Sequence, residues 1–416
     1  MRLSLLKSIA LALVPGLLFS CTKLSSPITG GPWPDSSMRR VGTPDLGYEK
    51  VLICYLEGYN NLSSDIVRNI NELCSGEIPF KHDKQALLIY AHNSLTDRDY
   101  VNPTEPVLIK AYQLYGVPVL DTIARFSSQA PGLTSSNMRQ VLTYIRNNFH
   151  SRSYGMLFSS HATGWIPASY PIDSEGSSWL SADGDEPSAS AQSIGAEYVG
   201  NPRTEYMLDV ADFAAAIPVH LDYLILDCCL MGAIECCYDL AGCSDYIVAS
   251  PAEVQSYGFD YHNMASRLFS GDEPDLEGLC ADYFEKCKRS ATVALYKSSE
   301  IGAVADACKK IVSYCGDKVF EIDPDDVEDY NYSFSYNYDM RDIFDKMGAK
   351  EEDLASLDSA LKKFILFKMG SDYLFDSDLD PERFSGVSMY LPSTSWPKLN
   401  ALYKNTGWSA YTGYLQ

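Results

Sequence analysis

Short apolar runs alternate with amphipathic segments through the first part of the chain. Continuous apolar runs of this length are typical of buried strands, and apolar residues at helical spacing are typical of helices packed on a sheet. The pattern predicts strands at Lys50–Tyr55, Ala86–Ala91, Val107–Tyr112, Tyr154–Ser160, Leu224–Asp227 and Tyr246–Ser250. It predicts helices at Ser63–Leu73, Ser135–Phe149 and Met207–Ala216, and one directly after Cys229. Such alternation favours an α/β fold with a mostly parallel sheet flanked by helices.

The pattern is more mixed from about residue 265 onward. Helices are expected over Leu276–Lys297, Ile301–Cys315 and Leu354–Lys368, and a strand over Gly386–Leu391. An acidic, tyrosine-rich stretch at Asp323–Tyr338 predicts a loop. We therefore expect a main domain over residues 48–264 and a C-terminal α+β subdomain over 265–416.

The first 20 residues have the pattern of a secretory signal. Arg2 and Lys7 precede an apolar run from Ile9 to Phe19, which is too short for a membrane-spanning helix. The run ends in Leu-Phe-Ser-Cys, which resembles a bacterial lipobox with lipidation at Cys21. Residues 21–47 are rich in Ser, Pro and Gly and predict a flexible tether. A bacterial cell-envelope protein, lipid-anchored on the periplasmic face or cell surface, is therefore expected; the alternative is a buried N-terminal strand with a chance cysteine.

Two strand ends carry the candidate chemistry. Cys229 follows the run Leu224-Ile225-Leu226-Asp227, where a helix N-terminus would favour the nucleophilic thiolate. His161 follows another apolar run, and parallel strands would bring both residues to one sheet edge. A cysteine nucleophile with a histidine base is the chemistry that this pair predicts.

The surrounding motifs resemble those of the clostripain family of cysteine peptidases. Asp227-Cys228-Cys229-Leu230-Met231 followed by Glu235 is similar to its nucleophile motif, and Ser159–Trp165 is similar to its histidine motif. Gly58-Tyr59-Asn60-Asn61-Leu62 is similar to the turn after its first strand. The resemblance covers the chain from about residue 48 to its end.

This resemblance implies a caspase-like fold and a cysteine endopeptidase that cleaves after Arg or Lys. Cys229 would be the nucleophile, His161 the base, and Asp227 the partner of a basic P1 side chain. The backbone N–H groups of Cys229 and Ala162 would stabilise the oxyanion, and no cofactor is implied. The expected partner is a peptide or protein substrate.

Two features leave alternatives open. Ala162 and Thr163 stand where the family has glycines, so a catalytically inactive surface lipoprotein that binds ligand on the same fold remains a second hypothesis. Family members are often processed between the histidine and the cysteine. The lone Lys or Arg between His161 and Asp227 is Arg203, so self-cleavage would fall at Arg203-Thr204. The other outcome is a chain that needs no cut.

Composition narrows the classes of partner. The formal net charge of −22 opposes binding to nucleic acid or anionic lipid, so membrane contact is expected only through the lipid anchor.

The 12 cysteines fall mostly in apolar patterns and predict buried small hydrophobes. A zinc site from Cys228, Cys229, Cys236, Cys237 and His220 is the sharper alternative, but its spacings are not those of zinc fingers or ribbons, so no metal is expected. The acids of residues 173–186 could form a paired-carboxylate glycosidase site, but a solvated loop is the favoured interpretation.

Overall fold

The computed structural model describes residues 47–96, 101–128, 131–167, 180–181, 193–201, 203–288, 290–330, 336–375 and 377–416. The predicted signal segment, Cys21 and the tether before Gly47 lie outside these residues. Across the described ranges, none of the helices combines the length and the apolar character that crossing a membrane requires.

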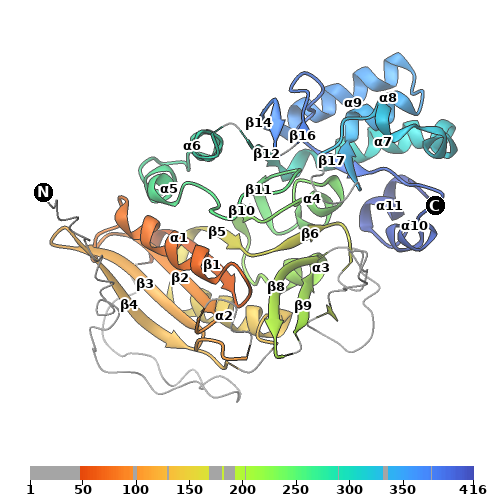
Figure 1. The fold of residues 1–416 in the computed structure, drawn as a ribbon. Helices are drawn as coiled ribbons and strands as arrows, with labels where there is room; N and C mark the ends of the chain where they lie inside the picture. Colours follow the sequence, from red (N-terminus) through yellow and green to blue (C-terminus); the bar gives the residue numbers. More distant parts are fainter. Residues whose placement is uncertain are drawn as a thin grey trace, which may run out of the picture.

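A nine-stranded sheet forms the centre of the molecule (Figure 1). Its five middle strands run parallel, in the order β11 (Ser244–Ala249), β10 (Leu221–Asp227), β5 (Ser151–Ser159), β1 (Tyr48–Gly58) and β2 (Gln85–Asn93). Antiparallel strands extend both edges: β12 (Thr292–Lys297) and β14 (Ile365–Gly370) beside β11, and β3 (Val107–Leu114) and β4 (Val117–Arg125) beside β2. The predicted mostly parallel sheet with flanking helices is confirmed.

Helices cover both faces of this sheet, which explains why its middle strands are mostly apolar and buried. In β1, Val51 and Ile53 pack in one core and Leu52 and Cys54 in the other, because alternate side chains of a strand point to opposite faces. One core lies under α1 (Ser63–Ser75), α5 (Tyr261–Phe269) and α6 (Leu276–Lys286). The other lies under α2 (Ser135–Asn148), α3 (Val210–Ala216), α4 (Ile234–Leu240), α7 (Ile301–Cys315), α8 (Met340–Lys346) and α9 (Glu351–Phe364).

The C-terminal part shares the central sheet, because β12 and β14 both come from it. Two predicted helices were therefore too long: Leu276–Lys297 is α6 followed by β12, and Leu354–Lys368 is α9 followed by β14. Pairing with β11 decides the structure of residues 292–297, whose local pattern alone does not separate strand from helix. The remaining C-terminal elements are η1 (Ser298–Glu300), η2 (Gly316–Glu321), η3 (Pro324–Asp326), β13 (Asn337–Asp339), β15 (Tyr373–Leu374), β16 (Ser377–Asp378), β17 (Ser388–Tyr390), α10 (Pro397–Tyr403) and α11 (Gly407–Thr412).

A small four-stranded sheet lies beside the carboxyl ends of β1 and β5. Its order is β6 (Ala162–Gly164), β8 (Ser193–Val199), β9 (Thr204–Asp209) and β7 (Leu180–Ser181). The predicted helix at Met207–Ala216 was wrong in its first part, because residues 207–209 belong to β9 and α3 begins at Val210. The Tyr198 N–H donates to the Tyr59 carbonyl (2.8 Å), so β8 is fastened to the turn that follows β1.

Candidate active site

The pairing of β5 with β10 brings the two candidate catalytic residues to one edge. These strands are parallel, and Asp227 is the register partner of Ser159. His161 and Cys229 each lie two residues beyond that pair. Both therefore leave the sheet at the same level, on adjacent strands, at the carboxyl edge where open α/β sheets bind ligands.

The turn after Cys229 differs from the predicted strand–helix junction. Leu230 has a positive φ of 63°, and the N–H groups of Leu230 and Gly232 donate to Ala252 and Ser250 (2.9 and 2.8 Å). These bonds hold an irregular turn, and α4 begins only at Ile234. The expectation that Cys229 sits at a helix N-terminus was therefore wrong.

The two adjacent cysteines have different environments. Cys228 is fully buried with its Sγ 3.7 Å from the Phe158 carbonyl oxygen, whereas Cys229 is partly exposed. The Cys229 Sγ accepts a hydrogen bond from the Val254 N–H (3.4 Å). Burial raises the pKa of Cys229 to about 12 and outweighs the Val254 N–H, which lowers it. This direction favours the neutral thiol over the expected thiolate.

His161 is held by residues from two other elements. Its Nε2 lies 2.6 Å from Oδ1 of Asn61, and its ring stacks on Tyr198 with a centroid separation of 5.9 Å. Burial, followed by the charge of Arg203, lowers the pKa of His161 to about 4, so the ring is neutral near pH 7. Because Asn61 Oδ1 is an acceptor, Nε2 carries the proton and Nδ1 has the lone pair that a base needs.

The histidine loop touches the cysteine turn. Gly164 has a φ of 64°, and a Cβ there would lie 2.8 Å from the Leu230 carbonyl oxygen, so this approach requires glycine. The buried Thr163 hydroxyl is satisfied, because it donates to the Ile166 carbonyl (2.6 Å) and contacts the Ser193 hydroxyl. Ala162 begins β6 and pairs with Ile194. The oxyanion roles of Cys229 and Ala162 stay predictions.

Asp227 is buried beside the candidate nucleophile with one oxygen unsatisfied. Its Oδ2 accepts hydrogen bonds from the Tyr261 hydroxyl (2.6 Å) and the Ser159 hydroxyl (3.0 Å). Its Oδ1 is buried and makes no hydrogen bond of good geometry among the described residues, although the Phe259 N–H is close enough to lower the pKa of Asp227. Burial raises the pKa of Asp227, while the bonds from Tyr261 and Ser159 favour the charged form. A carboxylate held in this way offers a position for a donor.

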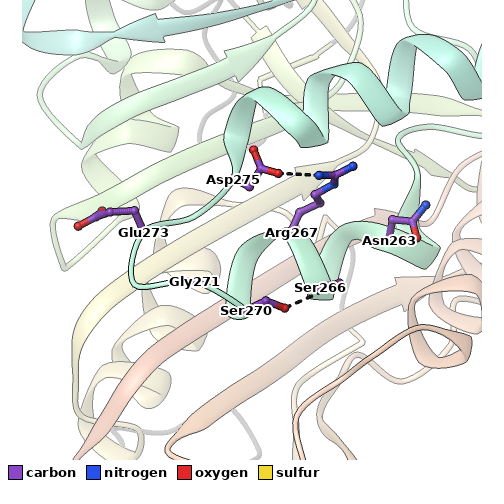
Figure 2. Close-up of a pocket in the computed structure, with 7 residues that line it drawn as sticks. All are labelled: Asn263, Ser266, Arg267, Ser270, Gly271, Glu273 and Asp275. Atoms are coloured by element: carbon purple, nitrogen blue, oxygen red, sulfur yellow. Dashed lines mark hydrogen bonds and ion pairs between the residues drawn. The ribbon is translucent and has the colours of Figure 1, made fainter.

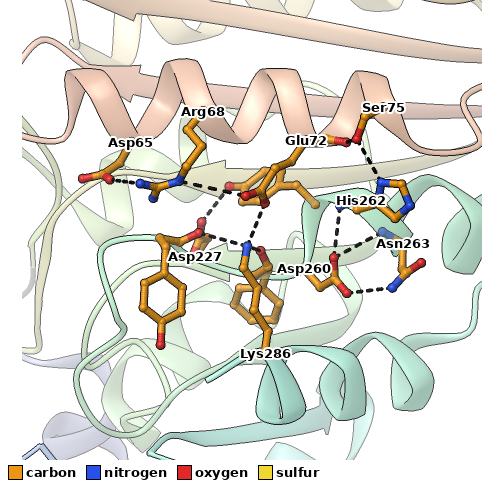
Figure 3. A network of polar contacts seen from close by, with 12 residues as sticks. Asp65, Arg68, Glu72, Ser75, Asp227, Asp260, His262, Asn263 and Lys286 are labelled. Carbon is orange, nitrogen blue, oxygen red and sulfur yellow. Dashed lines mark hydrogen bonds and ion pairs between the residues drawn. The ribbon is translucent and has the colours of Figure 1, made fainter. Parts of the chain in front are cut away.

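Lys286 supplies a positive charge near Asp227 but is anchored elsewhere (Figure 3). Its ammonium group donates to Glu72 Oε2 of α1 (2.8 Å) and to the Phe259 carbonyl (2.9 Å). In the close-up, Lys286 reaches up from α6 past Asp227 toward α1. The charge of Lys286 lowers the pKa of Asp227 without occupying Oδ1.

Arg203 and Glu235 have structural surroundings of their own. Arg203 lies in the turn between β8 and β9, where its guanidinium stacks over Tyr198 at 4.5 Å and pairs with Glu205. Glu235 is buried in α4, where its Oε1 accepts bonds from the Tyr390 N–H (3.1 Å) and the Tyr403 hydroxyl (2.6 Å). Glu235 therefore joins α4 to the C-terminal segment.

Other candidate sites lie apart from this edge. A pocket of about 390 Å³ between α5 and α6 contains none of the candidate catalytic residues (Figure 2). It is lined by Asn263, Ser266, Arg267, Ser270, Gly271, Glu273 and Asp275. Arg267 is paired with Asp275 across it (2.6 Å), so its charge is already compensated.

The described cysteines are all free thiols, and most of them are buried. This confirms the prediction of small buried hydrophobes for most of the described thiols. In the alternative zinc set, His220 is exposed and paired with Asp245 (2.9 Å). In the described ranges, the group of close metal-type ligands is a different one, Glu57, His92 and Glu197. The acids at residues 173–186 lie outside the described residues.

The sequence predicts His161, Cys229 and Asp227 as site residues but does not indicate the residues that surround them. In the sequence, Asn61 stands out only as part of a turn that resembles one of the clostripain family, although that turn follows β1, the strand beside β5. Tyr198 and Lys286 carried no local signal, since their roles depend on contacts between distant segments.

The chain is similar to known proteins both in sequence and in fold. The model of the Clostripain family matches residues 54–369. An inactive zymogen C11 protease from Parabacteroides distasonis has a similar structure, with a TM-score of 0.72 at 21% identity; the match covers 88% of this chain and 98% of that one. Iotapain, a secreted C11 cysteine protease from Bacteroides thetaiotaomicron, is similar with a TM-score of 0.70 at 22% identity. This match covers 88% of this chain and 99% of iotapain.

The structure of a secreted C11 cysteine protease from the same species, in complex with an irreversible peptide inhibitor, also has a TM-score of 0.70, at 21% identity. The match covers 88% of this chain and 98% of that one. A comparison with curated protein sequences gives no match. The structural likenesses show the fold, and the family match extends over most of the sequence, including both candidate motifs. This chain belongs to the clostripain family of cysteine peptidases.

Proposed function

We propose that this cysteine peptidase cleaves peptide bonds after Arg or Lys with a Cys229–His161 dyad. The observation that carries the proposal is the β5–β10 register, which places His161, Cys229 and Asp227 at one edge of the sheet. The unsatisfied Asp227 Oδ1 supports the basic P1 preference, because a guanidinium or ammonium group would supply the missing donor and a compensating charge. The peptide-inhibitor complex of the similar protease supports a peptide as the ligand.

The resting state of the dyad indicates how the reaction begins. Both members are neutral, since the pKa of Cys229 is raised to about 12 and that of His161 is lowered to about 4. The thiol proton therefore passes to His161 Nδ1 as the sulfur attacks the scissile carbonyl, and no stable ion pair forms beforehand. The side-chain Oδ1 of Asn61 keeps the His161 ring in the required tautomer and stabilises the imidazolium that forms.

The later steps follow from the same groups. The negative charge that develops on the carbonyl oxygen is stabilised by the backbone N–H groups of Cys229 and Ala162. His161 then gives its proton to the leaving amine, and a thioester with Cys229 remains. Water hydrolyses this thioester with His161 again as base, which returns the thiol.

The neutral dyad predicts the pH dependence of alkylation by iodoacetamide. Only the thiolate reacts, and its fraction rises about tenfold per pH unit below the thiol pKa. We expect the rate at Cys229 to rise steadily from about pH 5 to about pH 9. Peptide mass spectrometry measures it, with the partly exposed Cys243, whose pKa is also raised to about 12, as the internal comparison. A rate at Cys229 that is already constant below neutral pH would show a preformed thiolate–imidazolium pair.

Substitution of the two adjacent cysteines separates the nucleophile from its neighbour. Cys229→Ala should abolish turnover of a fluorogenic Arg peptide, because the thioester cannot form. Cys228→Ala should keep most of the activity, because Cys228 is buried against Phe158 and lies away from the substrate edge. Loss of activity in Cys228→Ala alone would refute the assignment. A wild type that cleaves no Arg or Lys peptide would favour the ligand-binding alternative.

Replacement of Asp227 tests the basic specificity. Asp227→Asn should lower kcat/KM for Arg and Lys peptides by about 10- to 150-fold, because a charge-assisted bond contributes about 1.5–3 kcal/mol. The matched control is Asp222→Asn on the same strand, which should leave kcat/KM within a factor of about two. Thermal unfolding of all three proteins separates specificity from stability. Normal cleavage by a folded Asp227→Asn protein would exclude Asp227 as the P1 partner.

We propose that the intact chain is the active form. Arg203 is the expected residue for self-cleavage, but its side chain is paired with Glu205 and stacked on Tyr198. A substrate segment must instead be extended with its P1 side chain in the enzyme pocket. Intact-mass analysis of wild type beside Cys229→Ala should show one chain in both, with wild-type activity. Fragments that join at Arg203-Thr204 only in the wild type would show self-processing instead.

We also propose a lipid anchor at Cys21, based on its lipobox-like sequence. In a bacterial host, the wild type should partition into the detergent phase of a Triton X-114 extract and Cys21→Ser into the aqueous phase. The same aqueous partitioning for both would exclude the anchor.

A further inference from the structure

A buried cluster of Glu57, His92 and Glu197 lies close to the active edge but takes no part in the proposed reaction. Glu57 is near the end of β1, His92 near the end of β2, and Glu197 in β8. Their ligand atoms lie within 4.8 Å of one another, and none of the three side chains is more than 1% exposed. Three ionisable groups removed from water in this way require charge compensation.

The arrangement is poor for hydrogen bonding. His92 Nδ1 is 3.0 Å from Oε1 of Glu57 and also 3.0 Å from Oε1 of Glu197. It makes a well-oriented hydrogen bond to neither, and His92 Nε2 and Glu57 Oε2 also have no partner among the described residues. Buried polar atoms in native proteins are almost always satisfied, so this set indicates a ligand at the centre.

We propose that Glu57, His92 and Glu197 bind a divalent transition-metal cation of the zinc type. Zinc binds imidazole nitrogen and carboxylate oxygen at about 2.0–2.2 Å, and tetrahedral angles then separate neighbouring donor atoms by about 3.3 Å. The two separations of 3.0 Å at His92 are close to that value. A nitrogen donor disfavours calcium and magnesium, which prefer oxygen ligands throughout.

The charge balance also favours a divalent ion. With a neutral imidazole, the two carboxylates carry two negative charges, which a divalent cation cancels. A proton on His92 is the competing occupant: burial lowers the pKa of His92, but the two carboxylates outweigh burial and raise the pKa to about 10. That proton cancels one of the two negative charges, and the other is cancelled only if Glu57, whose pKa burial raises to about 7, also holds a proton.

Backbone groups hold the carboxylates as a second layer of a metal site would. Glu197 accepts bonds from the N–H groups of Gly132 (2.6 Å) and Leu133 (3.0 Å), and Glu57 accepts one from Tyr59 (3.3 Å). A Cβ at Gly132 would lie 2.9 Å from Glu197 Oε1, so glycine allows this approach. Such outer contacts orient metal ligands and set their charge.

The position of the cluster suggests what the ion does. It would join β8 to the ends of β1 and β2. Tyr198, the residue after Glu197, stacks on His161, and Asn61 in the turn after β1 contacts His161 Nε2. The metal would therefore be a structural clamp beneath the base. This role is independent of the P1 specificity proposed above.

The test is metal content in a tag-free chain that carries Cys229→Ala, so that the candidate nucleophile cannot bind zinc. After incubation with zinc and gel filtration, elemental analysis should find about one zinc ion per chain. In the same background, His92→Gln and Glu197→Gln should each lower this to below about a tenth, since each removes one of three ligands. His161→Ala and the exposed-histidine variant His220→Gln should keep about one.

X-ray absorption at the zinc edge on the Cys229→Ala chain covers the case in which the ligand variants do not fold. The expected first shell contains one imidazole nitrogen, with oxygen as the other donors and no sulfur. In the Cys229→Ala chain, whose Glu57, His92 and Glu197 are unchanged, less than about a tenth of a zinc ion per chain would overturn the proposal. So would zinc retained by folded His92→Gln, or a sulfur ligand.

Discussion

The parallel pairing of β5 with β10 is the interaction on which the site depends. Because Asp227 is the partner of Ser159, the chain leaves both strands at the same level and His161 comes beside the Cys229 turn. A shift of one residue would turn each side chain of β10 to the opposite face of the sheet. The cores on both faces oppose such a shift, since Leu224 and Leu226 belong to one and Ile225 to the other. The geometry of the dyad therefore rests on the packing of the whole sheet.

Buried carboxylates also hold segments around the site together, and each has different partners. Asp227 is held by Tyr261 and Ser159, and Glu235 by Tyr390 and Tyr403. Glu57 faces His92. The cost of burying Asp227 and Glu235 is offset by donors from other segments, so Asp227 joins β10 to β5 and α5, and Glu235 joins α4 to the C-terminal part.

Much of the architecture could be predicted from the sequence. The parallel strands were found from their apolar runs, and α2 begins at Ser135 as predicted. The local pattern of residues 292–297 and 365–368 predicts helix, and this is wrong because strand pairing with a distant partner decides their structure.

Motif and order predicted that His161, Cys229 and Asp227 come to one edge of the sheet, as the β5–β10 register shows. They did not predict the protonation state of Cys229. The expected helix N-terminus depends on where α4 starts, and a turn held by Ala252 and Ser250 delays that start. Asn61, Tyr198 and Lys286 also escaped prediction, because each acts through a contact between segments far apart in the sequence.

The central claim is that Cys229 attacks a carbonyl whose basic P1 side chain is bound by Asp227. Covalent labelling tests it most directly. The intact chain is incubated with a peptidyl acyloxymethyl ketone that carries Lys at P1, beside a matched probe with Leu at P1, and the adduct is located by mass spectrometry. The account predicts one adduct per chain, on Cys229 and with the Lys probe alone. Labelling at another cysteine, equal labelling by both probes, or no labelling would contradict it.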